Sequence, residues 1–78
     1  MKNNNESWEF LTHNIIWLRK QLGYSRKRMA EVLEIGTGSL AKLEQGEIPP
    51  RLSANILFII HYRFGIRPSD LLGRRLDE

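Results

Sequence analysis

The segment from Ser25 to Gly46 constrains the fold of this chain more than any other part of the sequence. It reads SRKRMAEVLEIGTGSLAKLEQG, and its apolar residues recur at spacings of three and four on either side of a short turn. This spacing is the period of an amphipathic α-helix, and a leading serine and a trailing glycine are common helix start and stop signals. We predict two short helices, over residues 26–33 and 37–45, joined by a tight turn at Glu34-Ile35-Gly36.

The flanking sequence predicts three more helices, over about residues 8–22, 54–64 and 68–73. The candidate N-caps, in chain order, are Ser7 or Thr12, Ser25, Gly36 or Thr37, and Ser53. Pro68 suits the first turn of the last helix, because proline has no N–H to leave unpaired there. Two prolines predict a loop at residues 47–51.

These elements predict an all-α fold, a compact five-helix bundle in one domain over residues 8–73. A chain of 78 residues is long enough for one small core. It contains no cysteine, so no disulfide supports that core. We expect a flexible N-terminus at residues 1–7 and a loose charged tail at residues 74–78.

Composition excludes several classes of function. The net charge of +3 permits binding to nucleic acid without requiring it. No run of about 18 apolar residues is present, and the N-terminus lacks the apolar core of a signal peptide, so we expect a cytoplasmic protein that spans no membrane. His13 and His61 lie far apart, and no nucleophile–base pair, metal-ligand spacing or phosphate loop is apparent. We therefore expect no cofactor, no metal and no enzymatic activity.

Four pieces of the sequence, in this order and spacing, carry a family resemblance: IIWLRKQLGYS, RKRMAEVL, LAKLEQG and FGIRPSDLL. Between about Leu11 and Leu72 the chain resembles the phage repressor and Cro-like helix-turn-helix family, the XRE-type transcriptional regulators. The resemblance implies a lambda-repressor-like DNA-binding domain in which Ala30 lets the two helices of the motif cross closely. It also implies an ion pair between Arg19 and Glu44 that ties the first helix to the end of the third.

The resemblance further implies which residues meet double-stranded DNA, since the family places the N-terminus of the third helix in the major groove. The residues expected to face the bases are Thr37, Gly38, Ser39 and Lys42. Those expected along the phosphate backbone are Arg26, Lys27, Arg28, Gln45 and Arg51. Arg26 replaces the family's usual glutamine, so it should keep a phosphate contact and lose the bracing that an amide provides.

Each of these residues also has a purely structural interpretation. The basic run at residues 26–28 can be a solvated helix face, Thr37 can be only an N-cap, and Lys42 can be an ordinary surface lysine. Glu34 stands where the family often has glycine, and a left-handed conformation there costs about 1 kcal/mol relative to glycine. The segment IGTGSLA is poor in long base-reading side chains, so affinity would depend on phosphate contacts and duplex shape.

The predicted fourth helix has more apolar residues than one buried face requires. Leu57, Ile60 and Phe64 can supply that face, with His61 packed on the same inner side. The residues then left over, Ile56, Ile59 and Tyr62, either cover the N-terminal segment or form a twofold homodimer interface.

Taken together, the sequence predicts a sequence-specific DNA-binding transcriptional regulator, a homodimeric repressor on a short palindromic operator. Two alternatives use the same fold. One is a protein-interaction module that no longer reads DNA, and the other is an antitoxin-type protein with a protein partner.

Overall fold

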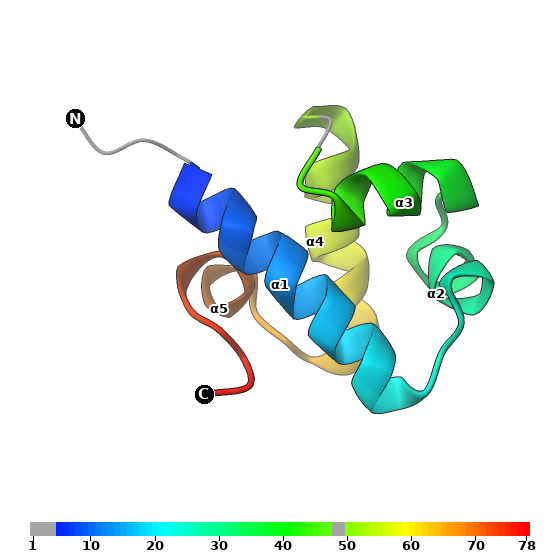
Figure 1. Cartoon of the computed structure of the whole chain (residues 1–78). Helices are drawn as coiled ribbons and strands as arrows, with labels where there is room; N and C mark the ends of the chain where they lie inside the picture. Colours follow the sequence, from blue (N-terminus) through cyan, green and yellow to red (C-terminus); the bar gives the residue numbers. More distant parts are fainter. Residues whose placement is uncertain (1–4, 48–49) are drawn as a thin grey trace.

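The structure is a computed structural model that describes the backbone of residues 5–47 and 50–78 and the side chains of residues 6–47 and 54–78. The described residues form five helices: α1 (Asn5–Leu22), α2 (Arg26–Leu33), α3 (Thr37–Glu44), α4 (Pro50–Phe64) and α5 (Pro68–Gly73). No strand occurs in the described ranges, so the predicted all-α class is confirmed. Figure 1 shows α1 crossing the middle of the bundle, with α5 on one side of it and α2 and α3 on the other.

The core forms where all five helices meet. It consists of fully or nearly fully buried apolar side chains, namely Leu11, Ile15, Leu18, Met29, Ala30, Leu33, Leu40, Leu43, Ile56, Ile60 and Leu71. Burying each of the larger ones contributes about 1.5–3 kcal/mol. Because α1 contacts both α3 and α5, it links the helix-turn-helix to the C-terminal part of the fold.

The helix-turn-helix has the predicted boundaries to within one residue. Ser25 caps α2, since its hydroxyl accepts a hydrogen bond from the N–H of Arg28 at 3.0 Å. Gly36, rather than Thr37, is the N-cap of α3. Glu34 closes α2 in the left-handed conformation (φ 60°, ψ 41°), which is the case in which glutamate costs more than glycine.

Two predicted helix starts were wrong. Helix α1 begins at Asn5, so Ser7 and Thr12 lie inside it, and the acidic Glu6 in its first turn favours the earlier start through the helix dipole. Helix α4 begins at Pro50, so Ser53 is not an N-cap and the predicted loop is shorter. Proline is well suited to the first helical position, which explains the earlier start. Ile48 and Pro49, also assigned to that loop, lie outside the described residues.

The C-terminal tail is docked, contrary to the expectation that it is loose. Asn14 is fully buried in α1, and its Nδ2 donates to the carbonyls of Leu71 at 2.9 Å and Arg74 at 2.8 Å. Its Oδ1 accepts from the N–H of Leu76 at 2.9 Å. One asparagine thus satisfies one backbone group of α5 and two of the tail, a role that an isolated buried polar residue does not reveal in the sequence.

A surface contact supports the same docking. His13 Nε2 lies 2.9 Å from Asp77 Oδ1, and this hydrogen bond holds the pKa of the Asp77 carboxyl below its ordinary value. Leu76 packs against the core nearby. The tail therefore closes over α1.

Candidate nucleic-acid interface

Helix α3 has one buried side and one exposed side. Leu40 and Leu43 are completely buried, whereas Thr37, Gly38 and Lys42 are exposed. Ser39 is half-buried. Because Gly36 offers no side-chain cap, the N–H groups of the first turn have no side-chain acceptor at this end. The helix therefore presents its N-terminal end and a polar face outward.

Most of the outward-facing side chains of α3 are short. Thr37 and Ser39 carry hydroxyls that can donate and accept, and Lys42 carries three donors. A Cβ built on Gly38 would meet no atom within 4 Å, so packing does not require glycine there. The missing side chain leaves room for close approach of another molecule to the backbone.

Glu44, at the C-terminal end of α3, holds two arginines. Arg19 Nε donates to its Oε2 at 2.8 Å, and Arg19 Nη2 donates to its Oε1 at 3.3 Å, so the contact implied by the resemblance is present and bidentate. Arg26 Nε donates to the same Oε1 at 3.1 Å. Only 5% of the Glu44 side chain is exposed, so this carboxylate fixes α1, α2 and α3 relative to one another.

The expectation that Arg26 would lose a bracing role was therefore wrong. Its Nε braces the end of α3 through Glu44, while 63% of its side chain remains exposed at the start of α2. Sequence reasoning paired Glu44 with Arg19 alone. The available signal was that a carboxylate has two oxygens and can accept from two guanidinium groups.

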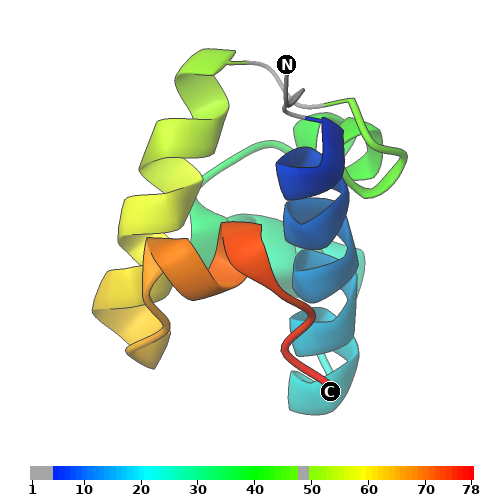
Figure 2. The same ribbon diagram turned by 90° about the vertical axis from the view of Figure 1, so that its left-hand side faces the viewer.

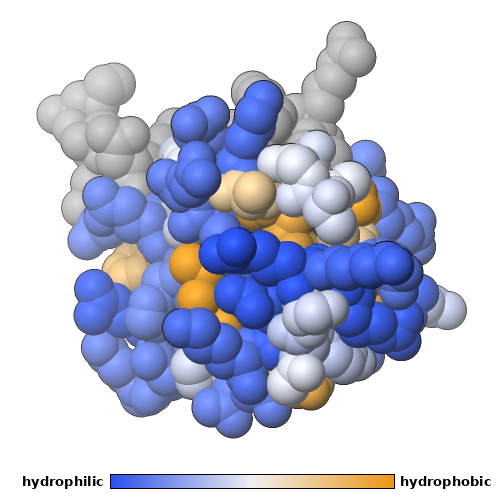
Figure 3. All heavy atoms as spheres, turned by 45° about the vertical axis from the view of Figure 1, so that its right-hand side comes forward, coloured by the Kyte–Doolittle hydropathy of each residue, from blue (hydrophilic) through white to orange (hydrophobic). Residues whose placement is uncertain are grey.

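The start of α2 carries the basic cluster, in which Arg26, Lys27 and Arg28 are all exposed. Arg28 Nη1 lies 3.4 Å from Glu31 Oε1, and the Arg28 guanidinium carbon lies 5.5 Å from the centre of the Tyr24 ring. Figure 3 shows that the face of the molecule on this side is mostly hydrophilic, with scattered apolar residues.

A hollow between α1, α2 and the end of α3 brings further positive groups together. Lys20, Arg19 and Arg26 line it beside Gln45, the C-cap of α3. Lys20 is exposed and was not among the residues predicted from sequence. It belongs to α1, outside the helix-turn-helix segment, and only the fold brings it to Arg26.

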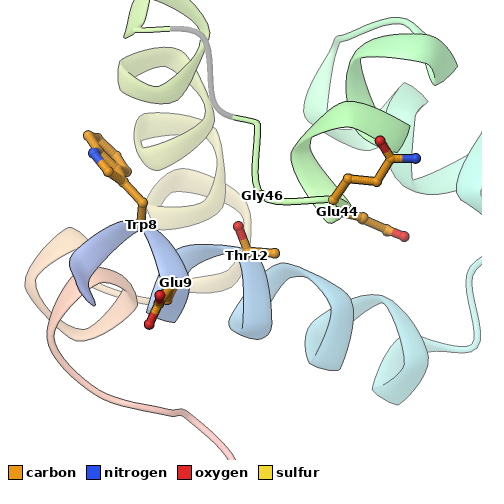
Figure 4. A pocket seen from close by; sticks show the side chains of 6 residues that line it. Trp8, Glu9, Thr12, Glu44 and Gly46 are labelled. Carbon is orange, nitrogen blue, oxygen red and sulfur yellow. The ribbon is translucent and has the colours of Figure 1, made fainter. Parts of the chain in front are cut away.

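A second hollow, on the other side of the C-terminal end of α3, has no basic residue among the described residues that line it. Figure 4 shows it between the first turns of α1, with Trp8, Glu9 and Thr12, and the end of α3 at Glu44 and Gly46. The Thr12 hydroxyl donates to the carbonyl of Leu43 at 3.3 Å, which ties the two helices together. Glu9 brings a negative charge to this hollow, so the positively charged side chains gather in the other hollow, with Lys20 and Arg26.

The remaining predicted site residues have mixed outcomes. The Arg51 side chain lies outside the described residues, although its backbone is in the first turn of α4. Ile56 was expected on a partner surface, and this was wrong, because it is completely buried and lies one helical turn from the buried Ile60. Ile59 is half-buried against the core, and Tyr62 is 89% exposed. 

Two other outcomes concern the outer side of α4. His61 is exposed and does not pack inward as expected. Phe58 is 70% exposed and was not predicted as a surface residue. The buried stripe of α4 runs through Ile56 and Ile60 instead of Leu57 and Ile60, and this rotation of the helix turns Phe58 outward.

A model of the helix-turn-helix family matches residues 15–71, more than half of the chain. The chain belongs to this family, in its XRE-type, Cro/C1-like form. The family is one of DNA-binding regulators, and the match contains the whole of α2 and α3 with the Glu44 contacts. Neither a curated protein nor a solved structure gives a match.

Two further findings concern the part of the chain that the structure describes. No helix there combines the length and apolar character needed to cross a membrane. No group of three or more His, Cys, Asp or Glu residues there is arranged to hold a metal ion.

Proposed function

We propose that this protein is a sequence-specific transcriptional regulator that binds a short palindromic operator as a homodimer and represses transcription there. One observation carries the proposal: α3 exposes its N-terminal end and its polar face, and the neighbouring helix α2 exposes a basic cluster at its start. An uncovered helix terminus suits a major groove, and a positive cluster on the neighbouring helix suits the phosphates that flank it. The mechanism is binding in the cytoplasm, with no cofactor and no catalytic step.

Lys42 is the main base-reading side chain in this proposal. Its ammonium can donate to O6 and N7 of a guanine, while Thr37 and Ser39 can contact base edges with their hydroxyls. Gly38 contributes no side chain and allows the duplex to approach the backbone. With so few long side chains on α3, much of the selectivity would come from duplex shape.

Phosphate contacts supply most of the affinity. Arg26, Lys27 and Arg28 lie at the start of α2, where backbone N–H groups also favour a phosphate. Arg26 is held at its Nε by Glu44, so less side-chain entropy is lost when its outer nitrogens bind a phosphate. Gln45 and Arg51 take flanking positions, the latter by family resemblance.

A homodimer fits the small reading surface. One domain makes few base contacts, and two copies on half-sites about one helical turn apart double the interface. Occupying an operator is enough to block transcription from an overlapping start site. Ile59 and Tyr62 remain the predicted partner-surface residues, while the burial of Ile56 removes it from that set.

Selection of bound duplexes from a random pool tests this function, followed by affinity measurement over a salt series. We expect an enriched, roughly palindromic sequence and an affinity that falls steeply between about 50 and 200 mM salt. Absence of binding at the lowest salt concentration would refute the proposal.

A second candidate is a protein-interaction module or antitoxin-type partner protein. The exposure of Phe58 and Tyr62 favours it, since large apolar side chains in contact with water often mark protein interfaces. Replacing Arg26 and Lys42 by alanine separates the two candidates. DNA affinity unchanged by these substitutions would favour the interaction module.

A further inference from the structure

The outer side of α4 is an apolar surface that the chain leaves uncovered. Phe58 and Tyr62 lie one helical turn apart, with 70% and 89% of their surface exposed, and Ile59 is half-buried between them and the core. Figure 2 shows α4 at the edge of the bundle, with no other described helix on its outer side. Two neighbouring exposed aromatic side chains are more than the scattered apolar exposure that any surface shows.

Opposite charges border this surface. Glu34 and Arg63 line the same hollow as Phe58, Ile59 and Tyr62. Both are exposed, yet neither forms an ion pair with another side chain in the ranges 6–47 and 54–78. The surface therefore carries one acid and one base that are both available to a partner.

The backbone at Glu34 points to a use for its side chain. It is the one residue other than glycine with a positive φ among those described, at 60°. The three glycines with positive φ occupy other turns without strain, and glycine would relieve the strain here too. A strained residue that persists where a simpler one fits suggests that its side chain has a function.

We propose that a second copy of this chain docks on this surface, with the two α4 helices antiparallel about a twofold axis between Phe58 and Tyr62. Phe58 of each copy then lies against Tyr62 of the other, and Glu34 of each faces Arg63 of the other. The inference rests on the proposed function, because it names the surface through which two copies would occupy paired half-sites.

The charge pattern selects a second copy over other partners. A strongly acidic or strongly basic partner would match only one of Glu34 and Arg63 and repel the other. A twofold axis brings the same flank of each copy together, so each acid meets a base and each aromatic pair occurs twice. The surface also reaches the turn before α3, so pairing here would fix the two recognition helices relative to one another.

Sedimentation velocity on the full chain without DNA tests the pairing. We expect a reversible dimer that the double substitution Phe58→Ser and Tyr62→Ser converts to monomer, while Arg75→Glu, a charge reversal away from this surface, leaves it intact. A wild type that stays monomeric at every concentration, or a dimer unaffected by the double substitution, would overturn the proposal.

Charge exchange tests the orientation. Glu34→Arg and Arg63→Glu should each weaken association about tenfold or more, because each change acts twice in a twofold dimer, and the combined exchange should restore it. Glu34→Gly should raise the melting temperature of the monomer and still weaken the dimer, a result that a structural role alone would not produce. Failure of the combined exchange to restore association overturns the pairing of Glu34 with Arg63.

Binding to a duplex with a single half-site keeps this inference separate from the proposed function. The serine double variant should bind one half-site like wild type and lose cooperativity on two. Loss of half-site binding by wild type would refute DNA recognition, whereas retained cooperativity in the variant would refute this dimer surface.

Discussion

The outer faces of α3 and α4 differ in what they expose and in how they are supported. The α3 face is polar and short, and the helix beneath it is fixed by buried Leu40 and Leu43 and by the Glu44 contacts. The α4 face is apolar and large, and its exposed aromatic residues touch little else. The α3 face is therefore firmly held but offers only short polar side chains and one lysine, while the α4 face suits a partner that covers it.

The buried side of α3 and the exposed side of α4 should differ most in how much they contribute to the free energy of unfolding. Leu40→Ala should cost about 2–5 kcal/mol of unfolding free energy, because it leaves a cavity in the core. Phe58→Ser in the monomer should change that free energy by less than about 0.5 kcal/mol, as most exposed substitutions do. Urea unfolding of both variants at low protein concentration checks this. Equal losses would show that Phe58 is part of the core.

The next effect concerns the support of α3. Glu44→Gln should lower the free energy of unfolding by about 2 kcal/mol, because the largely buried Arg19 loses its charged partner and Arg26 loses its contact with α3. The matched control is Glu31→Gln, whose pairing with Arg28 is solvent-exposed and worth less than about 1 kcal/mol. Thermal unfolding compares the two. If Glu44→Gln were as mild as its control, Glu44 would not organise the three helices.

Two lysines should separate the recognition of bases from the electrostatic attraction to phosphates, with a smaller effect. Lys42→Ala should reduce discrimination between the selected operator and random DNA by about 1–2 kcal/mol. Lys27→Ala should weaken binding to both DNAs equally and lower the salt dependence by about one phosphate contact. Fluorescence anisotropy on both duplexes measures this. Uniform weakening by Lys42→Ala would place Lys42 on the backbone instead of the bases.

A change in stability with pH, smaller than the effects above, is expected at Asp77 in the tail, away from both faces. The pKa of the Asp77 carboxyl is lowered in the folded state, so its stabilising contribution is present above the unfolded pKa of about 3.9 and is lost as the pH falls through the lower folded value. Wild type should therefore melt slightly above Asp77→Asn at neutral pH, and the gap should close below about pH 4. A gap that persists in acid would assign the difference to some other cause.

Local signals made most of the fold predictable. The cap at Ser25 and the turn that begins at Glu34 are each specified by neighbouring residues, and the structure has both. The start of α4 was misplaced because Ser53 and Pro50 both suit a helix N-terminus, and sequence alone does not decide between them.

Features that depend on distant residues were not predictable in the same way. The tail appeared loose because the buried partner of its backbone groups, Asn14, lies about sixty residues earlier. The burial of Ile56 depends on how α4 rotates against the other helices, and an unbroken apolar run is compatible with several rotations. The second arginine on Glu44 likewise follows from the approach of α2 to α3. The residues proposed to touch DNA remain predictions from the family resemblance.

The Asn14 contacts also bear on how the molecule comes apart. They join residues separated by up to 62 positions. The chain between α1 and the tail is thus a long loop that these hydrogen bonds close. Closing so long a loop costs only slightly more entropy than closing one half its length. Releasing the tail would leave a buried amide without partners, so the tail and α1 should open together. Their amide hydrogens should then exchange with solvent as one cooperative unit.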